Sequence, residues 1–208
     1  MTAPADERAR RPAFAGWSRA GVLRGALGGA AAIGGGIALG RRGGAEPLAA
    51  PSDDMDAEIL RVLLLLERVQ EAFYGAALER ARLEGALLRF ATAVGRQERE
   101  HVDYLTEQLG GRAPAAPRTD FGDSLSDPDR FRDTAIELEE ATLATYIGQG
   151  ASLTREAVAG IAGLISVEAR QVAWVRDLAR VSPAPNAADP ARDRDDVLNA
   201  LREGGFIQ

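Results

Sequence analysis

The apolar residues between Ser52 and Arg180 recur at steps of three and four, the spacing that places side chains on one face of an α-helix. Apolar and polar residues do not alternate over any stretch long enough to indicate a β-strand. Interruptions at residues 83–85, 112–126 and 148–150 divide the pattern into four long segments. We therefore predict an all-α chain built on four helices.

Capping residues and helix breakers mark the predicted boundaries. These signals are Ser52 and Asp53 before the first helix, Gly110 and Gly111 after the second, Ser126 and Asp127 before the third, Ser152 or Thr154 before the fourth, and Pro183 and Pro185 after its expected end near Arg180. The connection between the second and third helices is much longer than the other two. Four such helices with one long connection describe a four-helix bundle with a crossover.

Each of the four apolar stripes carries a glutamate where an apolar residue is expected. In the first and third helices a tyrosine follows seven residues later, and in the second and fourth a histidine or glutamine follows three residues later. The residues are Glu67 and Tyr74, Glu98 and His101, Glu139 and Tyr146, and Glu168 and Gln171. The chain therefore reads as two related helical hairpins.

Four glutamates on buried faces need compensation, because an unpaired buried carboxylate is costly. Residues three apart share a helix face, so Glu98 and His101 can bind the same ion. Carboxylates from the other helices would complete a metal site of the kind built in carboxylate bundles, and these ligand types suit iron or manganese. The candidate metal ligands are Glu67, Glu98, His101, Glu139 and Glu168.

Residues of roughly 54–180 resemble the ferritin-like superfamily, and within it the bacterial ferritin-like domain proteins of the desiccation-related type. The resemblance rests on LERVQEAFYGAAL, QEREHVDYLTEQLGG, FGDSLSDPDRFRDTAIELEEATLATYIG and ISVEARQVAWVRDL, with a weaker echo in DDVLNALREGGFIQ. It implies a ferritin-like bundle that binds one or two iron or manganese ions. If the protein is an enzyme, the resemblance implies a ferroxidase-like or peroxide-consuming oxidoreductase.

The last helix departs from the family pattern at one position. Family members often have Glu-Ala-Arg-His there, whereas this chain has Gln171, and His101 is its only histidine. Gln171 is expected to be a weak ligand or to lie behind the ligands, and Tyr74 and Tyr146 to hydrogen-bond a carboxylate of a neighbouring helix. The competing interpretation is a structural bundle with a decayed site, in which Gln171, the tyrosines and Arg170 stabilise the carboxylates without metal.

The N-terminal part differs in character from the rest. Residues 25–40 carry no charge, and seven arginines accompany them within residues 1–45, which predicts an export signal or membrane anchor. Ser18–Arg24 resembles a degenerate twin-arginine signal. Residues 46–53 read as a linker, 54–181 as the bundle, and 182–208 as a Pro/Asp-rich tail with a short helix. We expect an exported protein of the cell envelope or exterior, with membrane contact through residues 20–40; a cleaved signal and a cytosolic tail remain alternatives.

Charge and motifs exclude several functions. All 25 basic residues are arginine, against 31 acidic residues, and the net charge of −6 combines +5 in residues 1–45 with −11 in the acidic region that follows. This region has no basic stripe, so nucleic-acid binding is not expected. No phosphate-binding loop or dinucleotide fingerprint occurs, so no nucleotide is expected. With no cysteine, disulfides and thiolate ligands are excluded. A homodimer is compatible with the sequence, whereas a closed cage is disfavoured because the two ends of the chain would obstruct it.

Overall fold

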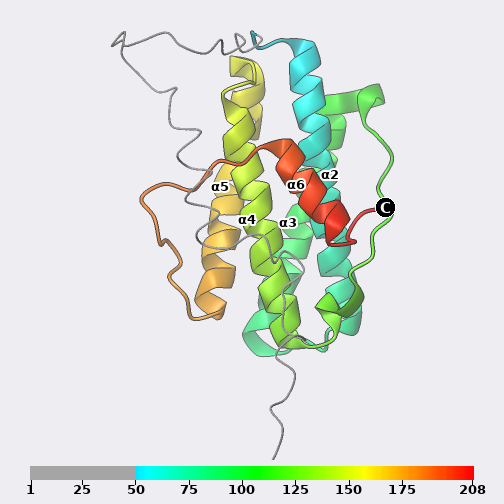
Figure 1. Cartoon of the computed structure of the whole chain (residues 1–208), viewed down its shortest axis with the longest axis vertical. Helices are drawn as coiled ribbons and strands as arrows, with labels where there is room; N and C mark the ends of the chain where they lie inside the picture. Colours follow the sequence, from blue (N-terminus) through cyan, green and yellow to red (C-terminus); the bar gives the residue numbers. More distant parts are fainter. Residues whose placement is uncertain (1–49) are drawn as a thin grey trace, which may run out of the picture.

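The computed structural model describes residues 50–208, and the predicted segment 1–45 lies outside them. The described part is helical, with a single isolated bridge between Thr119 and Ile207 in place of any sheet. Its α-helices are α2 (Asp53–Arg80), α3 (Gly85–Leu109), α4 (Pro128–Gly150), α5 (Arg155–Leu178) and α6 (Arg194–Glu203), with 3₁₀ turns at Gly110–Arg112 and Gly122–Leu125 (Figure 1). The predicted all-α fold is confirmed.

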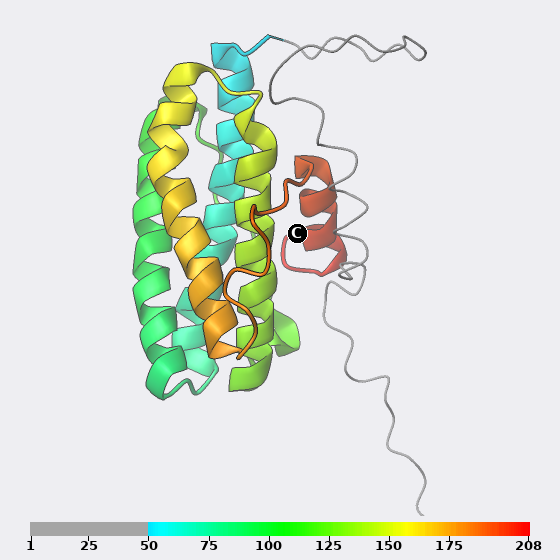
Figure 2. The same ribbon diagram turned by 90° about the vertical axis from the view of Figure 1, so that its left-hand side faces the viewer.

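Helices α2 to α5 lie side by side and form the bundle (Figures 1 and 2). The chain runs down α2 and up α3, returns along the outside of the bundle through the crossover, and then runs up α4 and down α5. The crossover thus joins opposite ends of α3 and α4, as a long connection between the second and third helices requires. Helix α6 lies across the outside of the bundle, where it packs on α4.

The predicted caps start three of the four helices. The Ser52 hydroxyl accepts a hydrogen bond from the backbone of Met55, and Asp127 accepts two from the first turn of α4. Helix α5 begins after Thr154 rather than Ser152, because the Thr154 hydroxyl accepts from Ala157 N at 3.2 Å. It ends at Leu178, two residues before the predicted end.

The glutamates divide the core into two apolar clusters. One cluster is aromatic and includes Phe73, Phe90 and Phe131, all fully buried; the other is aliphatic and includes Leu63 and Leu105. On every bundle helix the glutamate falls between residues of the two clusters, so the four carboxylates occupy one layer across the middle of the bundle.

Leu78 continues the apolar spacing of the first helix, yet it lies outside the core. Leu78 is 44% exposed, whereas Ala77 beside it is fully buried. The buried stripe of α2 continues from Tyr74 through Ala77 to Ala81. Because small alanines take the inward positions there, the larger Leu78 is displaced to the surface.

The C-terminal tail docks on the bundle. Phe206 is 1% exposed and lies against Phe121 of the crossover, with ring centroids 5.8 Å apart. Upstream, Arg192 N donates to Ala144 O at 2.9 Å, which holds the tail against α4. A Cβ on Gly148 would lie 2.1 Å from Arg192 O. Position 148 therefore has no room for a side chain.

Gly148→Ala should loosen the tail. The clash is with backbone, so the segment around Arg192 must move, and we expect the free energy of unfolding to fall by about 1–3 kcal/mol. Gly150→Ala is the matched control, because nothing lies within 4 Å of its Cβ and alanine favours the helix by up to about 1 kcal/mol. Urea denaturation and the rate of proteolysis within residues 181–193 measure the effect. Equal behaviour of the two variants would contradict it.

A long-range cap joins the first and fourth bundle helices. Asp56 Oδ1 accepts from Thr154 N at 2.9 Å, and Asp56 Oδ2 accepts from the Thr154 hydroxyl at 2.5 Å. Asp56 is 9% exposed, so both bonds are partly shielded from water. The carboxylate therefore fixes the start of α5 against α2.

Asp56→Ala should lower the free energy of unfolding by about 1–3 kcal/mol, because two hydrogen bonds to a charged acceptor are lost together. Asp54→Ala removes an exposed acid from the same helical turn and controls for the helix dipole, whose contribution is about 0.3–1 kcal/mol. Urea denaturation of both variants is the measurement. A loss no greater in Asp56→Ala than in Asp54→Ala would show that the contact is not stabilising.

Candidate metal centre

Four predicted site residues converge inside the bundle. Glu67 of α2, Glu98 and His101 of α3, and Glu168 of α5 offer ligand atoms that all lie within 4.8 Å of one another. The three glutamates are fully buried and His101 is 6% exposed. The four side chains thus share one dry interior.

A single imidazole nitrogen faces the three carboxylates. His101 Nδ1 lies 3.2 Å from Glu67 Oε2, 3.5 Å from Glu98 Oε2 and 3.1 Å from Glu168 Oε1. One ring N–H donates one good hydrogen bond at most to such a group. Burial opposes protonation of His101, but the attraction of the three nearby carboxylates, Glu168, Glu67 and Glu98, outweighs it and raises the pKa of the imidazole far above its usual range.

The carboxyl groups cannot all ionise easily without a cation. Burial, followed by the charges of neighbouring glutamates, raises the pKa values of Glu98 and Glu168 well above the usual 4.5. Burial also acts on Glu67, but the hydrogen bonds from His101, Glu98 and Tyr146 and the charge of His101 together outweigh it and lower the pKa of that carboxyl. The protein therefore holds one stable carboxylate and two that favour a proton or a metal ion.

Buried polar atoms without hydrogen-bond partners concentrate in this layer. Among residues 50–208 they include Glu98 Oε2, both carboxylate oxygens of Glu168, Glu139 Oε2 and Gln171 Oε1. Such atoms are rare in folded proteins and call for an explanation. Carboxylate oxygens and an imidazole nitrogen directed at one point form a donor set for a transition-metal ion. The residues present therefore fit a metal.

Both tyrosines hydrogen-bond a carboxylate of a neighbouring helix, as predicted. Tyr146 OH donates to Glu67 Oε1 at 2.5 Å, and Tyr74 OH donates to Glu139 Oε1. Burial and the acceptor's charge raise the pKa values of both phenols, so each remains a proton donor. The tyrosines thus orient Glu67 and Glu139 from behind.

Glu139 and Gln171 lie beside the four-residue group rather than in it. Glu139 is fully buried, and burial raises its pKa to about 7, but its oxygens are not among the atoms that gather around His101. Gln171 Nε2 donates to Glu98 Oε1 at 2.7 Å and to Gln97 Oε1 at 3.2 Å. The glutamine therefore directs its amide nitrogen, not its oxygen, at the centre's edge.

The arginine proposed as a metal-free partner does not serve that role. Arg170 is exposed, and its Nη1 bonds the Ser166 hydroxyl on its own helix at 3.4 Å. The reason is its rotation: two positions from Glu168 along a helix, it points away from the bundle.

Three further polar residues near the centre were not predicted from the sequence: Gln70, Thr142 and Gln97. Gln70 and Thr142 are buried and hydrogen-bond each other at 2.7 Å beside Glu139. A signal for the first two was present, because every bundle glutamate is followed three residues later by a polar residue. The pairs are Glu67 and Gln70, Glu98 and His101, Glu139 and Thr142, and Glu168 and Gln171.

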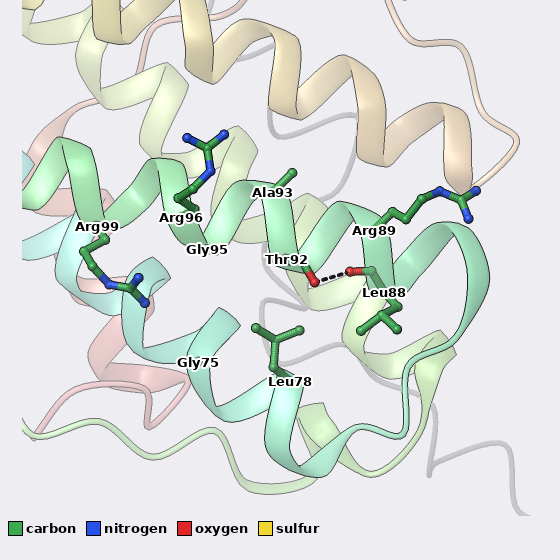
Figure 3. A pocket seen from close by; sticks show the side chains of 9 residues that line it. All are labelled: Gly75, Leu78, Leu88, Arg89, Thr92, Ala93, Gly95, Arg96 and Arg99. Atoms are coloured by element: carbon green, nitrogen blue, oxygen red, sulfur yellow. Dashed lines mark hydrogen bonds between the residues drawn. The ribbon is translucent and has the colours of Figure 1, made fainter.

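A surface groove of about 650 Å³ lies elsewhere (Figure 3). It runs over the outer side of α2 and α3 between the exposed Leu78 and Leu88, and three arginines, Arg89, Arg96 and Arg99, stand along it. None of the four convergent residues lines it. The groove is therefore not the opening of the metal centre.

Helix α5 is also strongly apolar. Among residues 50–208 it is the one helix long and apolar enough, by length and composition, to cross a membrane. It also carries the buried Glu168 and Gln171 and packs against α3 and α4. Its hydropathy alone therefore does not indicate a membrane span.

Comparison with protein families agrees with this geometry. Residues 55–180 match the model of the ferritin-like domain, which covers more than half of the chain and all four bundle helices but for their outermost residues. The chain belongs to the ferritin-like domain family. No curated protein matches it.

Replacing Glu168 by glutamine should stabilise the metal-free protein. An acid whose pKa is raised by folding loses stability as pH rises above its unfolded value of 4.5, since the unfolded chain releases the proton more readily. At pH 7 we expect Glu168→Gln to gain about 1–3 kcal/mol, and near pH 4 to gain almost nothing.

Urea denaturation of chelator-treated protein at several pH values measures this difference. Glu100→Gln is the control, because Glu100 is an exposed acid paired with Arg96 and should change stability by less than about 0.5 kcal/mol. A variant less stable than the wild type at pH 7 would show that the carboxylates do not repel one another.

Proposed function

We propose that this protein binds one transition-metal ion, iron or manganese, through Glu67, Glu98, His101 and Glu168. The observation that supports the proposal is the set of partnerless buried carboxylate oxygens around His101 Nδ1. A cation at their centre would satisfy these oxygens and neutralise their repulsion. Hard oxygen donors with one nitrogen favour these metals over softer ones.

Two features favour one ion over two. Glu139, whose Oε1 accepts from Tyr74, lies outside the group of ligand atoms that gather around His101, and Gln171 stands where the family pattern would place an imidazole. A neutral amide whose nitrogen already faces Glu98 is a poor ligand in that orientation. The second position of a two-metal centre is therefore weakened.

The residues around the ligands would orient them and exclude water, and would not take part in a reaction themselves. Tyr146 holds Glu67 with its other oxygen free toward His101, and Gln171 holds Glu98 in the same way. The apolar clusters on both sides keep water out of the layer. A bound iron or manganese ion would supply one-electron redox chemistry with oxygen or peroxide, which is where an oxidoreductase activity would arise.

We also propose a stress-related role and a location in the cell envelope or outside the cell. Similarity to the desiccation-related proteins supports a stress-related role, and the arginine-flanked uncharged segment at residues 25–40 supports export by a twin-arginine-like signal or an envelope anchor. A homodimer is compatible with both.

A second candidate function is a structural bundle with a decayed site. Gln171 in the histidine position, bonded to Glu98, favours it, because a hydrogen-bonded amide stabilises a carboxylate without metal. The two proposals differ in whether the purified protein holds metal.

Metal analysis tests both proposals. Protein purified without chelator, or reloaded with Fe²⁺ or Mn²⁺ without oxygen, should hold about one ion per chain, and His101→Ala should hold almost none. Gln171→His should add a second, weaker ion, because it restores an imidazole facing Glu98. Elemental analysis and calorimetric titration measure the stoichiometry; a wild-type chain that stays essentially metal-free would establish the structural alternative.

A further inference from the structure

Helices α3 and α5 run antiparallel and meet along a seam. Four contacts follow one another along it in regular order. They are Phe90 with Trp174, Gln97 with Gln171, His101 with Glu168, and Tyr104 with Gly160.

The two ends of this seam are closed by aromatic rings. Trp174 packs edge-on against Phe90 with ring centroids 5.2 Å apart. At the other end the Tyr104 hydroxyl lies so close to Gly160 that a Cβ there would be 2.6 Å away. The two contacts between these ends, Gln97 with Gln171 and His101 with Glu168, are polar and border the carboxylate layer.

A continuous chain of hydrogen bonds leads inward from the middle of the seam. Gln97 is partly exposed, Gln171 is 2% exposed and Glu98 is fully buried. Gln171 Nε2 donates to Gln97 Oε1 at 3.2 Å and to Glu98 Oε1 at 2.7 Å. The Gln171 amide thus bridges a residue that reaches the surface and a ligand of the proposed centre.

We propose that the Gln97–Gln171 amide pair is the gate through which a cation reaches the buried carboxylates. The inference rests on the proposed metal-binding function. A cation leaving water needs an oxygen donor at every step, because an unsolvated charge inside a protein is very costly. The pair supplies two neutral amide oxygens in series, and Gln171 Oε1 is buried without a partner.

Among residues 50–208, the opposite side of the centre offers no comparable path. There Tyr146 covers Glu67, and the Gln70–Thr142 pair is 0% and 2% exposed. His101, the one slightly exposed ligand, also lies on the α3–α5 seam, one turn from Gln97. The polar residues that connect the centre to the surface therefore lie on the α3–α5 seam.

Passage requires Gln171 to exchange one partner. When Gln97 rotates outward, Gln171 Nε2 keeps only its bond to Glu98, and the amide can turn its partnerless oxygen toward an entering ion. Rotation of a partly exposed side chain is fast, so the bond between the two amides and the bulk of residue 97 would set the rate. Gln97 is thus a positioning residue and not a ligand.

Two substitutions at position 97 separate a gate from a structural contact. Gln97→Ala and Gln97→Leu both remove the bond to Gln171, but alanine opens the path whereas leucine fills it with an apolar group. We expect Co²⁺ uptake and release about tenfold faster in Gln97→Ala and slower in Gln97→Leu, with similar equilibrium affinity. Gln97→Glu should speed uptake in a salt-dependent manner.

The test is stopped-flow absorbance of Co²⁺ mixing with chelator-treated full-length protein, with equilibrium titration of each variant. Gln108→Leu is the matched control, because Gln108 is an exposed glutamine of the same helix, about two turns past His101. Opposite rate changes at position 97 with an unchanged control support the gate. Unchanged rates, or rates shifted in the same direction by alanine and leucine, overturn the gate alone. Absence of equilibrium Co²⁺ binding to the wild type overturns the metal-binding proposal and the gate with it.

Discussion

The rest of the structure depends on one unbalanced contact: three buried carboxylates around a single imidazole nitrogen. A protonated His101 neutralises one of them, and nothing else in the described layer carries positive charge into it. Neighbouring polar side chains donate toward these acids, Tyr146 to Glu67 and Gln171 to Glu98. A core built only for stability would replace such a layer with apolar residues, since buried charges are weak stabilisers.

The position of this layer explains how the bundle tolerates it. Apolar clusters lie on both sides and contain the largest fully buried side chains. The helices are also tied together away from the layer, by the Asp56 contact to Thr154 and by the docked tail. The free energy of folding gained at these contacts offsets the cost of burying ionisable groups, as is common at functional sites.

Helix positions and the convergence of the glutamates were predictable because both follow from local rules. Caps such as Asp127 and the three-residue step from Glu98 to His101 act within one helix, so the sequence alone encodes them. The deviation of Glu139, the Gln97–Gln171 bond and the displacement of Leu78 were not predictable. They depend on how far each helix slides and rotates against its neighbour, and a helical period leaves both quantities undetermined.

Charge balance in the dry layer relates the number of ions to the number of acids. Glu67, Glu98 and Glu168 with a neutral His101 carry three negative charges, so one divalent ion would leave one charge uncompensated. A proton on Glu98 or Glu168, the carboxyls whose pKa values burial raises, would balance it. Two divalent ions would instead need a fourth carboxylate, and Glu139 is the one available, but its oxygens lie outside the group that gathers around His101. The orientation of Glu139 and the glutamine at position 171 therefore favour the same outcome, a centre balanced for one ion and one proton.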